Sequence, residues 1–178
     1  MRIYTLGYEG LGLEAYVDIL RAFNVGVVLD VREKAWSQRP EFIKSKMDHG
    51  LAMAGIDYIH VQSAGNPSAI RKNVFTADEC LRRYREHIKG KPGCVSELHA
   101  LVKSASEADR PACLTCYERN PQHCHRSVLI DALIEMDVSV EPVHLPLTAP
   151  INHRRQKTTQ EGSLLKTAFL FPDFLPTT

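Results

Sequence analysis

The chain has 178 residues, a length that fits one domain with a modest appendage and excludes a large multidomain protein. Hydrophobic residues make up 44% of it, enough to build a core without disulfides or a structural metal. Lys and Arg total 22 against 21 for Asp and Glu, a formal charge of +1. This balance excludes a polyanion-binding surface driven by bulk charge, although it leaves room for a local basic cleft.

The opening residues contain neither an apolar signal segment nor a small-residue cleavage site, and the longest apolar stretches are only a few residues long. We therefore expect a cytoplasmic protein that does not enter a membrane. Its five cysteines are an odd number in a chain without export signals. That count favours reduced thiols over a disulfide framework.

Short apolar segments alternate with segments of helical period along the chain. The predicted strands are residues 3–6, 25–29, 57–61, 111–116 and 138–145, the last of them at an edge. The predicted helices are residues 13–23, 40–51, 76–88, 95–105 and 121–136, and residues 62–73, which lack a period, are predicted to be a loop. Strands and helices in alternation predict an α/β fold, with an open, mostly parallel, Rossmann-like sheet of about five strands and helices on both faces.

The predicted α/β domain spans residues 1–150, and residues 151–178 differ from it in composition. This C-terminal tail joins a basic polar run to a short apolar segment that ends near Pro172. An apolar segment on an unsupported tail would be exposed to water, so we expect the tail to pack on the domain or on a partner subunit. The second arrangement would make the protein a homodimer.

Polar and ionisable residues follow four successive predicted strands, at the edge where a parallel sheet places its ligands. Glycine, aromatic, charged and cysteine residues are predicted to lie together at this carboxyl edge of the sheet. The residues that we expect to bind a ligand are Gly7, Tyr8, Asp30, Arg32, His125, Arg126 and Ser127. The candidate catalytic residues are Cys124 and Glu118.

The segments IYTLGYEG, LDVRE, RPEF and above all CYERNPQHCHRS resemble the domain of unknown function 488 family, over roughly residues 1 to 145. The specific part is the Cys-x-Glu that is followed by Cys-His-Arg. The resemblance implies a small, cytoplasmic α/β protein of an uncharacterised family, with these motifs as its site. It supplies no chemistry of its own.

Cys124 is the candidate nucleophile. A helix capped by Asn120 and opening at Pro121 would hold Cys124 in its first turn, where free backbone N–H groups and the helix dipole favour a thiolate. Neighbouring histidines and Arg126 would lower its pKa further. The alternative is an inert cysteine packed under the end of the sheet, since free cysteines are among the most buried residues.

A bound metal is a separate interpretation of the same segment. Cys116, Cys124 and either His123 or His125 are soft or borderline ligands that suit Zn or Fe. The spacing matches no known zinc finger, so we expect no cofactor and keep a bound Zn or Fe as the alternative. A redox pair between Cys116 and Cys124 is open as well, provided that a turn brings the sulfurs together.

Asp30 and Arg32 have the same parity along an extended chain and therefore point the same way. The pair either aims a guanidinium at an anionic ligand or forms a structural ion pair. Lys34, Trp36 and Arg39 follow in one loop with the only tryptophan of the chain. Cations beside an aromatic ring suit a phosphate with an attached base, and a solvated basic loop is the alternative.

Glu118 has two interpretations. In a partly desolvated cleft its pKa would rise toward general acid or base duty, whereas beside a guanidinium it would serve as a clamp. Tyr8 is a candidate hydrogen-bond partner for a ligand, and Gly7 marks a close approach of the backbone to another group. His60 is expected to be a satisfied strand-end histidine.

The leading hypothesis is an enzyme or ligand-binding domain for a small anionic molecule, such as a nucleotide or phosphorylated compound. The anion would contact Arg32, Arg126 and the helix that opens at Pro121. The alternative is a non-catalytic redox- or metal-sensing module that uses Cys116, Cys124 and the neighbouring histidines. Nucleic-acid binding is the third hypothesis, because short basic runs recur in the chain, although its near-zero net charge opposes it.

Overall fold

The computed structural model describes residues 1–148. These residues form one α/β domain around a parallel sheet with the strand order β3-β2-β4-β1-β5. The strands are β1 (Arg2–Gly7), β2 (Val27–Asp30), β3 (Asp57–His60), β4 (Ala112–Cys116) and β5 (Glu141–His144). The predicted α/β class, the parallel sheet and the edge position of the last strand are confirmed. The predicted tail, residues 151–178, lies outside the described residues.

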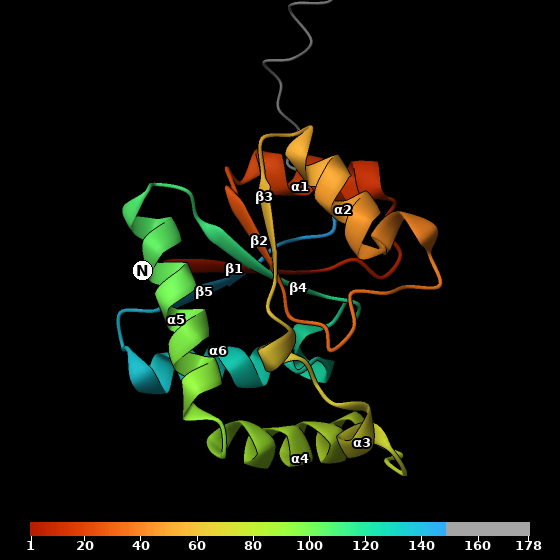
Figure 1. Cartoon of the computed structure of the whole chain (residues 1–178), viewed down its shortest axis with the longest axis vertical. Coiled ribbons are helices and arrows are strands. Elements are labelled where there is room, and N and C mark those ends of the chain that lie inside the picture. Colours follow the sequence, from red (N-terminus) through yellow and green to blue (C-terminus); the bar gives the residue numbers. More distant parts are fainter. Residues whose placement is uncertain (149–178) are drawn as a thin grey trace, which may run out of the picture.

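Helices cover both faces of the sheet (Figure 1), and each face has its own apolar core. One face carries α1 (Leu13–Ala22) and α2 (Lys44–Ala52), and the other carries α4 (Ala77–Lys89), α5 (Pro92–Glu107) and α6 (Arg126–Met136). Side chains alternate along β4, so Cys113 packs on the α1 side and Leu114 on the α5 side. Among residues 1–148, no helix combines the length and apolar character needed to cross a membrane.

Strand β4 comes late in the chain yet lies between β1 and β2. Cys116 at its end pairs in register with Gly7 of β1, and Thr115 pairs with Asp30 of β2. The chain leaves β1 and β2 toward the face of α1 and α2, but it leaves β4 toward the face of α6. Connections that diverge to opposite faces open a crevice at the carboxyl edge of a parallel sheet, which is where ligands bind.

The helix predicted to run from Pro40 to Leu51 is divided. A 3₁₀ turn at Pro40–Phe42 is followed by Ile43 in extended conformation, and α2 begins at Lys44. The backbone here bonds to other parts of the chain, since the Phe42 carbonyl accepts from the Arg32 guanidinium and the Lys44 N–H donates to Ala35. Helical spacing of apolar residues alone did not reveal this break.

The prediction that residues 62–73 form a loop was wrong in part. A 3₁₀ turn at Gln62–Ala64 is fixed by the Tyr84 hydroxyl, which donates to the Ala64 carbonyl at 2.6 Å. The short helix α3 (Ser68–Arg71) follows, and its first N–H donates to the carboxylate of Glu33. Both turns are held by distant side chains, so they leave no periodic signal in the local sequence.

The predicted opening of the last helix at Pro121 was also wrong. Pro121–His123 form a separate 3₁₀ turn whose N-cap is Asn120, Cys124 is extended with φ −117° and ψ 141°, and α6 begins only at Arg126. The Cys124 N–H donates to the Pro121 carbonyl, which closes the short turn and ends it. Cys124 therefore lies between two helical segments and not in the first turn of one.

Candidate functional site

Asp30 and Arg32 form a buried ion pair at the end of β2. The Arg32 guanidinium lies 2.6 Å from Asp30 and also donates to the Tyr8 hydroxyl and the Phe42 carbonyl, each at 2.9 Å. The Tyr58 hydroxyl donates to the same carboxylate at 2.6 Å. The predicted parity of the two residues agrees with this contact, and the geometry favours the structural ion pair over a guanidinium aimed at a ligand.

Gly7 is the last residue of β1, and Tyr8, which follows it, contacts the Asp30–Arg32 pair through its hydroxyl. A Cβ at Gly7 would lie 1.8 Å from the carbonyl oxygen of Glu118, so the close approach expected at this glycine is to protein backbone. The Tyr8 ring stacks on Phe42 with centroids 4.1 Å apart. Its hydroxyl is already the acceptor for Arg32, so its remaining role toward a ligand is to line the pocket described below.

Four side chains meet beyond the end of β4, and we call them the thiol cluster: Cys116, Glu118, Cys124 and His125. One potential ligand atom from each lies within 4.8 Å of all the others. The thiols of Cys116 and Cys124 lie 3.0 and 3.1 Å from Glu118 Oε2, and 3.8 and 3.9 Å from His125 Nδ1. Both sulfurs are free thiols, as expected from the cysteine count.

The local chain geometry creates this convergence. Cys116 is the last residue of β4, and the turn at Pro121–His123 returns the chain so that extended Cys124 faces Cys116 and Glu118. His125 then precedes α6 and lies 2.7 Å through Nε2 from the Val31 carbonyl. A carbonyl only accepts, so Nε2 carries the hydrogen and Nδ1 presents its lone pair to the sulfurs when the ring is neutral.

Charge is distributed unequally over the thiol cluster. Burial opposes ionisation of Cys124, but its contacts with Cys116, His125 and Arg126 outweigh this and lower its pKa well below the ordinary value. The hydrogen bond to Cys124, with burial, raises the pKa of Cys116 well above its ordinary value. Burial likewise raises the pKa of Glu118. Of the two thiols, Cys124 is therefore the one whose surroundings favour ionisation.

Arg126 supports the cluster from behind. It is 1% exposed, and its guanidinium donates to Cys124 Sγ at 3.2 Å and to the Glu118 carbonyl at 2.5 Å. It does not line the pocket, so the direct anion contact expected of Arg126 is not what this geometry offers. The clamp expected between the Glu118 carboxylate and a guanidinium is not formed: Arg126 contacts the backbone carbonyl of Glu118, and the carboxylate faces the thiols.

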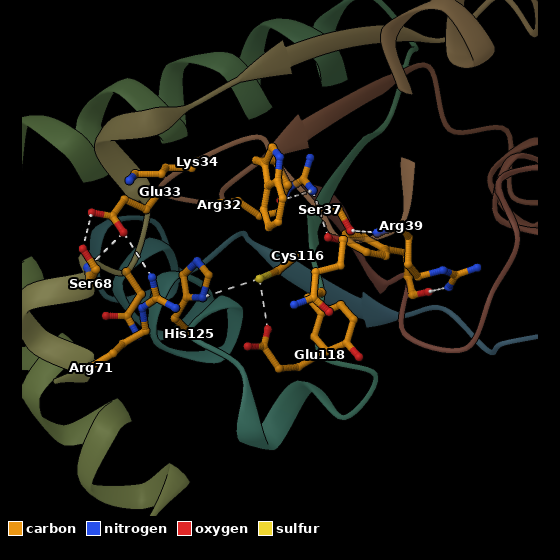
Figure 2. A pocket seen from close by; sticks show the side chains of 15 residues that line it. Arg32, Glu33, Lys34, Ser37, Arg39, Ser68, Arg71, Cys116, Glu118 and His125 are labelled. Atoms are coloured by element: carbon orange, nitrogen blue, oxygen red, sulfur yellow. Dashed lines mark hydrogen bonds and ion pairs between the residues drawn. The ribbon is translucent and has the colours of Figure 1, made fainter. Parts of the chain in front are cut away.

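A pocket of about 610 Å³ opens over the cluster (Figure 2). Cys116, Glu118 and His125 line its floor, whereas Cys124 lies behind them. The walls come from the loop after β2, from Tyr117 and from the α3 segment. The remaining lining residues are Tyr8, Arg32, Glu33, Lys34, Trp36, Ser37, Gln38, Arg39, Asn66, Ser68, Arg71 and Tyr117.

Three further candidates lie apart from the floor of the pocket. His123 is exposed and outside the thiol cluster, so of the two histidines proposed as metal ligands the structure brings only His125 to the cysteines. The Ser127 hydroxyl donates to the Cys124 carbonyl at 2.9 Å. His60 is paired with the Arg32 carbonyl at 2.8 Å, as expected of a strand-end histidine.

Sequence reasoning missed the wall of the pocket formed by the α3 segment. Glu33 binds the Ser68 N–H at 2.9 Å and Arg71 at 3.1 Å, which fixes α3 against the loop after β2. Asn66, also in the wall, leaves its buried Oδ1 without a hydrogen-bond partner. Because Glu33 is 35 residues from Ser68 and 38 from Arg71, no local pattern indicated these contacts.

The family described as Domain of unknown function DUF488 matches residues 12–133, which is more than half of the chain. The chain belongs to the DUF488 family. The matched region of this DUF488 protein contains Asp30, Arg32 and the whole thiol cluster, and the resemblance inferred from its motifs is confirmed. No curated protein matches the chain. No solved structure matches it either.

Proposed function

We propose that this DUF488 protein binds a small anionic molecule, a nucleotide or another phosphorylated compound, in the pocket above the thiol cluster and acts on it there as an enzyme. The observation that carries the proposal is the composition of one pocket. It combines cationic walls, exposed aromatic rings and a floor of ionisable groups. Ligand sites of this kind join a few convergent polar groups to apolar surface.

The charge of the pocket supports an anionic ligand. Its lining has the cationic side chains of Arg32, Lys34, Arg39 and Arg71, of which Arg32, Arg39 and Arg71 are paired with Asp30, Glu41 and Glu33, so Lys34 is the cation left for a ligand. Lys34 is exposed and forms no ion pair with any residue in the described part of the chain. A concave cationic surface raises the local concentration of anions even when the net charge of the protein is near zero.

Two aromatic side chains support a ligand with a planar ring. Trp36 is 65% exposed and Tyr117 is 45% exposed, and both line the pocket. Large aromatic side chains are usually well buried, so two exposed rings at one opening favour a binding role. Stacking on such rings is tolerant of the identity of the base, which agrees with a nucleotide.

The reactive groups remain those predicted from the motif. Glu118 faces the pocket, where its carboxyl group is within reach of a ligand, and we propose it as the general acid or base. Cys124 Sγ lies 3.1 Å behind the Glu118 carboxylate, so its thiolate reaches a substrate only if that carboxylate moves. Glu118 is therefore the first residue to replace in a test of catalysis.

Nucleic-acid binding receives less support. Of the basic run at residues 82–85, Arg83 pairs with Glu79 and Arg85 with Asp131, while Tyr84 is fully buried and offers no stacking surface. Arg71 is paired with Glu33. These local pairs neutralise the charge that phosphate contacts would need.

Trp36 provides the assay, because it is the only tryptophan in the chain. Full-length protein is titrated with adenosine 5′-monophosphate, ribose 5-phosphate, phosphate and adenosine while tryptophan fluorescence is recorded. We expect a saturable change with the nucleotide and weaker binding of adenosine and phosphate, which occupy only part of the pocket. The proposal is wrong if neither the nucleotide nor the sugar phosphate gives a saturable change.

Matched lysine variants test the anion site. Lys34→Ala removes a cation from the pocket wall and is expected to weaken nucleotide binding by about tenfold, the usual effect of one charged hydrogen bond. Lys46→Ala removes an exposed lysine outside the pocket and should leave binding unchanged. Equal affinities of the two variants would contradict the assignment. If Glu118→Gln turns over bound substrate as fast as the native protein, the catalytic assignment is wrong.

A further inference from the structure

We propose that the thiol cluster is a binding site for a divalent transition-metal ion of the zinc class, held by Cys116, Cys124 and His125 with Glu118 as the fourth ligand. This inference goes beyond the proposed function, because it rests on the meeting of the four side chains and not on an anion in the pocket. It concerns the floor of the pocket and makes no use of Lys34, Trp36 or Arg39.

The spacing of the donor atoms fits a tetrahedral ion. With metal–sulfur bonds of about 2.3 Å and metal–nitrogen or metal–oxygen bonds of about 2.0–2.2 Å, the ligand atoms of a tetrahedral zinc site lie about 3.4–3.8 Å apart. The two sulfurs lie 3.8 and 3.9 Å from His125 Nδ1 and 3.0 and 3.1 Å from Glu118 Oε2. These four separations bracket the required range, and the remaining pairs of donor atoms also lie within 4.8 Å of each other, so small side-chain shifts would complete the site.

The donor types also fit. Two thiolates and an imidazole select zinc or iron over magnesium and calcium, which prefer oxygen ligands. As metal ligands, the two cysteines and Glu118 are ionised and His125 is neutral, and in these states the atoms that face the cluster are all acceptors. Buried acceptors that face one another need a shared cation or shared protons. In the metal-free protein protons fill this role, and a metal ion would displace them.

The surroundings of the cluster resemble the outer shell of a metal site. Metal-binding histidines commonly donate their second ring N–H to a carbonyl, and His125 Nε2 lies 2.7 Å from the Val31 carbonyl. Arg126 donates to Cys124 Sγ at 3.2 Å, a contact of the kind that stabilises a metal-bound thiolate. Both contacts orient their groups before an ion arrives.

The pocket gives the ion both an entry path and an open side. Cys116, Glu118 and His125 line the pocket, as Figure 2 shows, so the fourth ligand, Glu118, faces the space above the cluster. Three protein ligands with an exchangeable fourth position are typical of catalytic zinc sites, whereas structural sites are closed by four firm ligands. With an ion bound, Cys124 is a ligand and not a free nucleophile.

Cobalt is the probe of choice, because Co²⁺ replaces Zn²⁺ and its thiolate complexes absorb visible and near-ultraviolet light. Full-length, reduced protein freed of metal is titrated with Co²⁺ and then with Zn²⁺. We expect one equivalent of Co²⁺ to give thiolate charge-transfer and tetrahedral ligand-field bands, which Zn²⁺ then removes. Absence of these bands in the native protein overturns the inference without recourse to any variant.

Variants locate the site. Cys124→Ser and His125→Gln are each expected to weaken Co²⁺ binding by more than the about 10–100-fold typical of outer-shell losses. Cys80→Ser is the matched control, because Cys80 is outside the cluster and accepts from Asn66 at 3.3 Å, which a hydroxyl reproduces. Circular dichroism establishes that each variant is folded. Unchanged affinity in folded Cys124→Ser contradicts the assignment.

The two proposals fail separately. Lys34→Ala is expected to retain full Co²⁺ binding while it loses nucleotide affinity, since Lys34 is not part of the cluster. A protein that binds nucleotide but no cobalt would keep the proposed function and lose the metal site. A protein that binds cobalt but none of the anionic probes would do the reverse.

Discussion

Two buried polar groups lie at the carboxyl edge of the same sheet, and they use their hydrogen-bonding capacity in opposite ways. In the group around Asp30 and Arg32, which we call the Asp30–Arg32 corner, donors and acceptors match. The guanidinium donates to Asp30, Tyr8 and Phe42, and the Asp30 carboxylate also accepts from the Tyr58 hydroxyl. In the thiol cluster, four groups that could each offer a ligand atom to a metal ion lie with these atoms within 4.8 Å of one another. Burial and ionisable groups are common to both, so neither property alone distinguishes them; the two groups differ in whether cationic donors face carboxylate and carbonyl acceptors or potential ligand atoms face one another.

The largest expected effect tests the structural role of the corner. Asp30→Asn keeps the shape of the side chain but leaves the buried Arg32 guanidinium without a counter-charge, which should cost about 3–5 kcal/mol of unfolding free energy. Asp57→Asn is the matched control, because Asp57 pairs with Arg110 at an exposed position and should cost less than about 1 kcal/mol. Urea denaturation measures both. Similar losses in the two variants would remove the distinction between the corner and an ordinary surface pair.

The next effect tests the cluster by addition of metal. At a free Zn²⁺ concentration 100 times the dissociation constant, the native protein should gain about 2.7 kcal/mol of unfolding free energy, since the ion binds the folded state. Asp30→Asn should show the same gain if it still folds, and Cys124→Ser should show little or none. Thermal unfolding with and without Zn²⁺ gives these differences. A gain retained by Cys124→Ser would place the ion elsewhere.

Gly7 lies beside both groups, because the next residue, Tyr8, contacts Arg32 and the Gly7 backbone packs against the Glu118 carbonyl. Its replacement therefore tests both groups together. In Gly7→Ala the new methyl group meets the Glu118 carbonyl, so the loop that carries Glu118 must shift, at a cost of about 1–3 kcal/mol. Co²⁺ affinity should fall as well, because Glu118 belongs to the cluster. Gly12→Ala is the control, since nothing lies within 4 Å of a Cβ at Gly12. Native-like stability and Co²⁺ affinity in Gly7→Ala would contradict this packing.

The smallest effect concerns pH. Burial, with the nearby Arg126, lowers the pKa of His144 below 6.5. A lowered histidine pKa means that the unfolded chain binds more protons, so this contribution to stability is full above about pH 6.5 and is lost as the pH falls through the folded pKa. Titration by NMR should give a His144 pKa below 6.5. A value above 6.5 would contradict the described burial of this ring together with its nearness to the charge of Arg126.

The sequence predicted the fold and the contents of the site better than it predicted local geometry. The parity of Asp30 and Arg32 follows from strand alternation, which depends only on backbone period, and their side chains do meet. The extended conformation of Cys124 did not follow, because an N-cap and a proline are compatible with a 3₁₀ turn as well as an α-helix.

The properties of the cysteines also depended on geometry that the sequence did not predict. Five cysteines are equivalent in a composition count, but burial raises the pKa of Cys113 to about 12, whereas Cys124 has its pKa lowered by its neighbours. Those neighbours include Cys116, brought from the end of β4, as well as the adjacent His125 and Arg126. The wall of the pocket likewise depends on a contact between residues far apart in the chain, that of Glu33 with Arg71.

The strand order has a consequence for the folding of the chain. Because β4 lies between β1 and β2, these two strands are joined into one sheet only after residues 112–116 have been synthesised and inserted between them. A nascent chain that stops before this point has only β2 and β3 to pair, with β1 exposed as an unpaired edge that is prone to aggregation. Folding is therefore expected to depend on a late, long-range insertion, and the strand that completes the sheet is also the one that delivers Cys116 to the site.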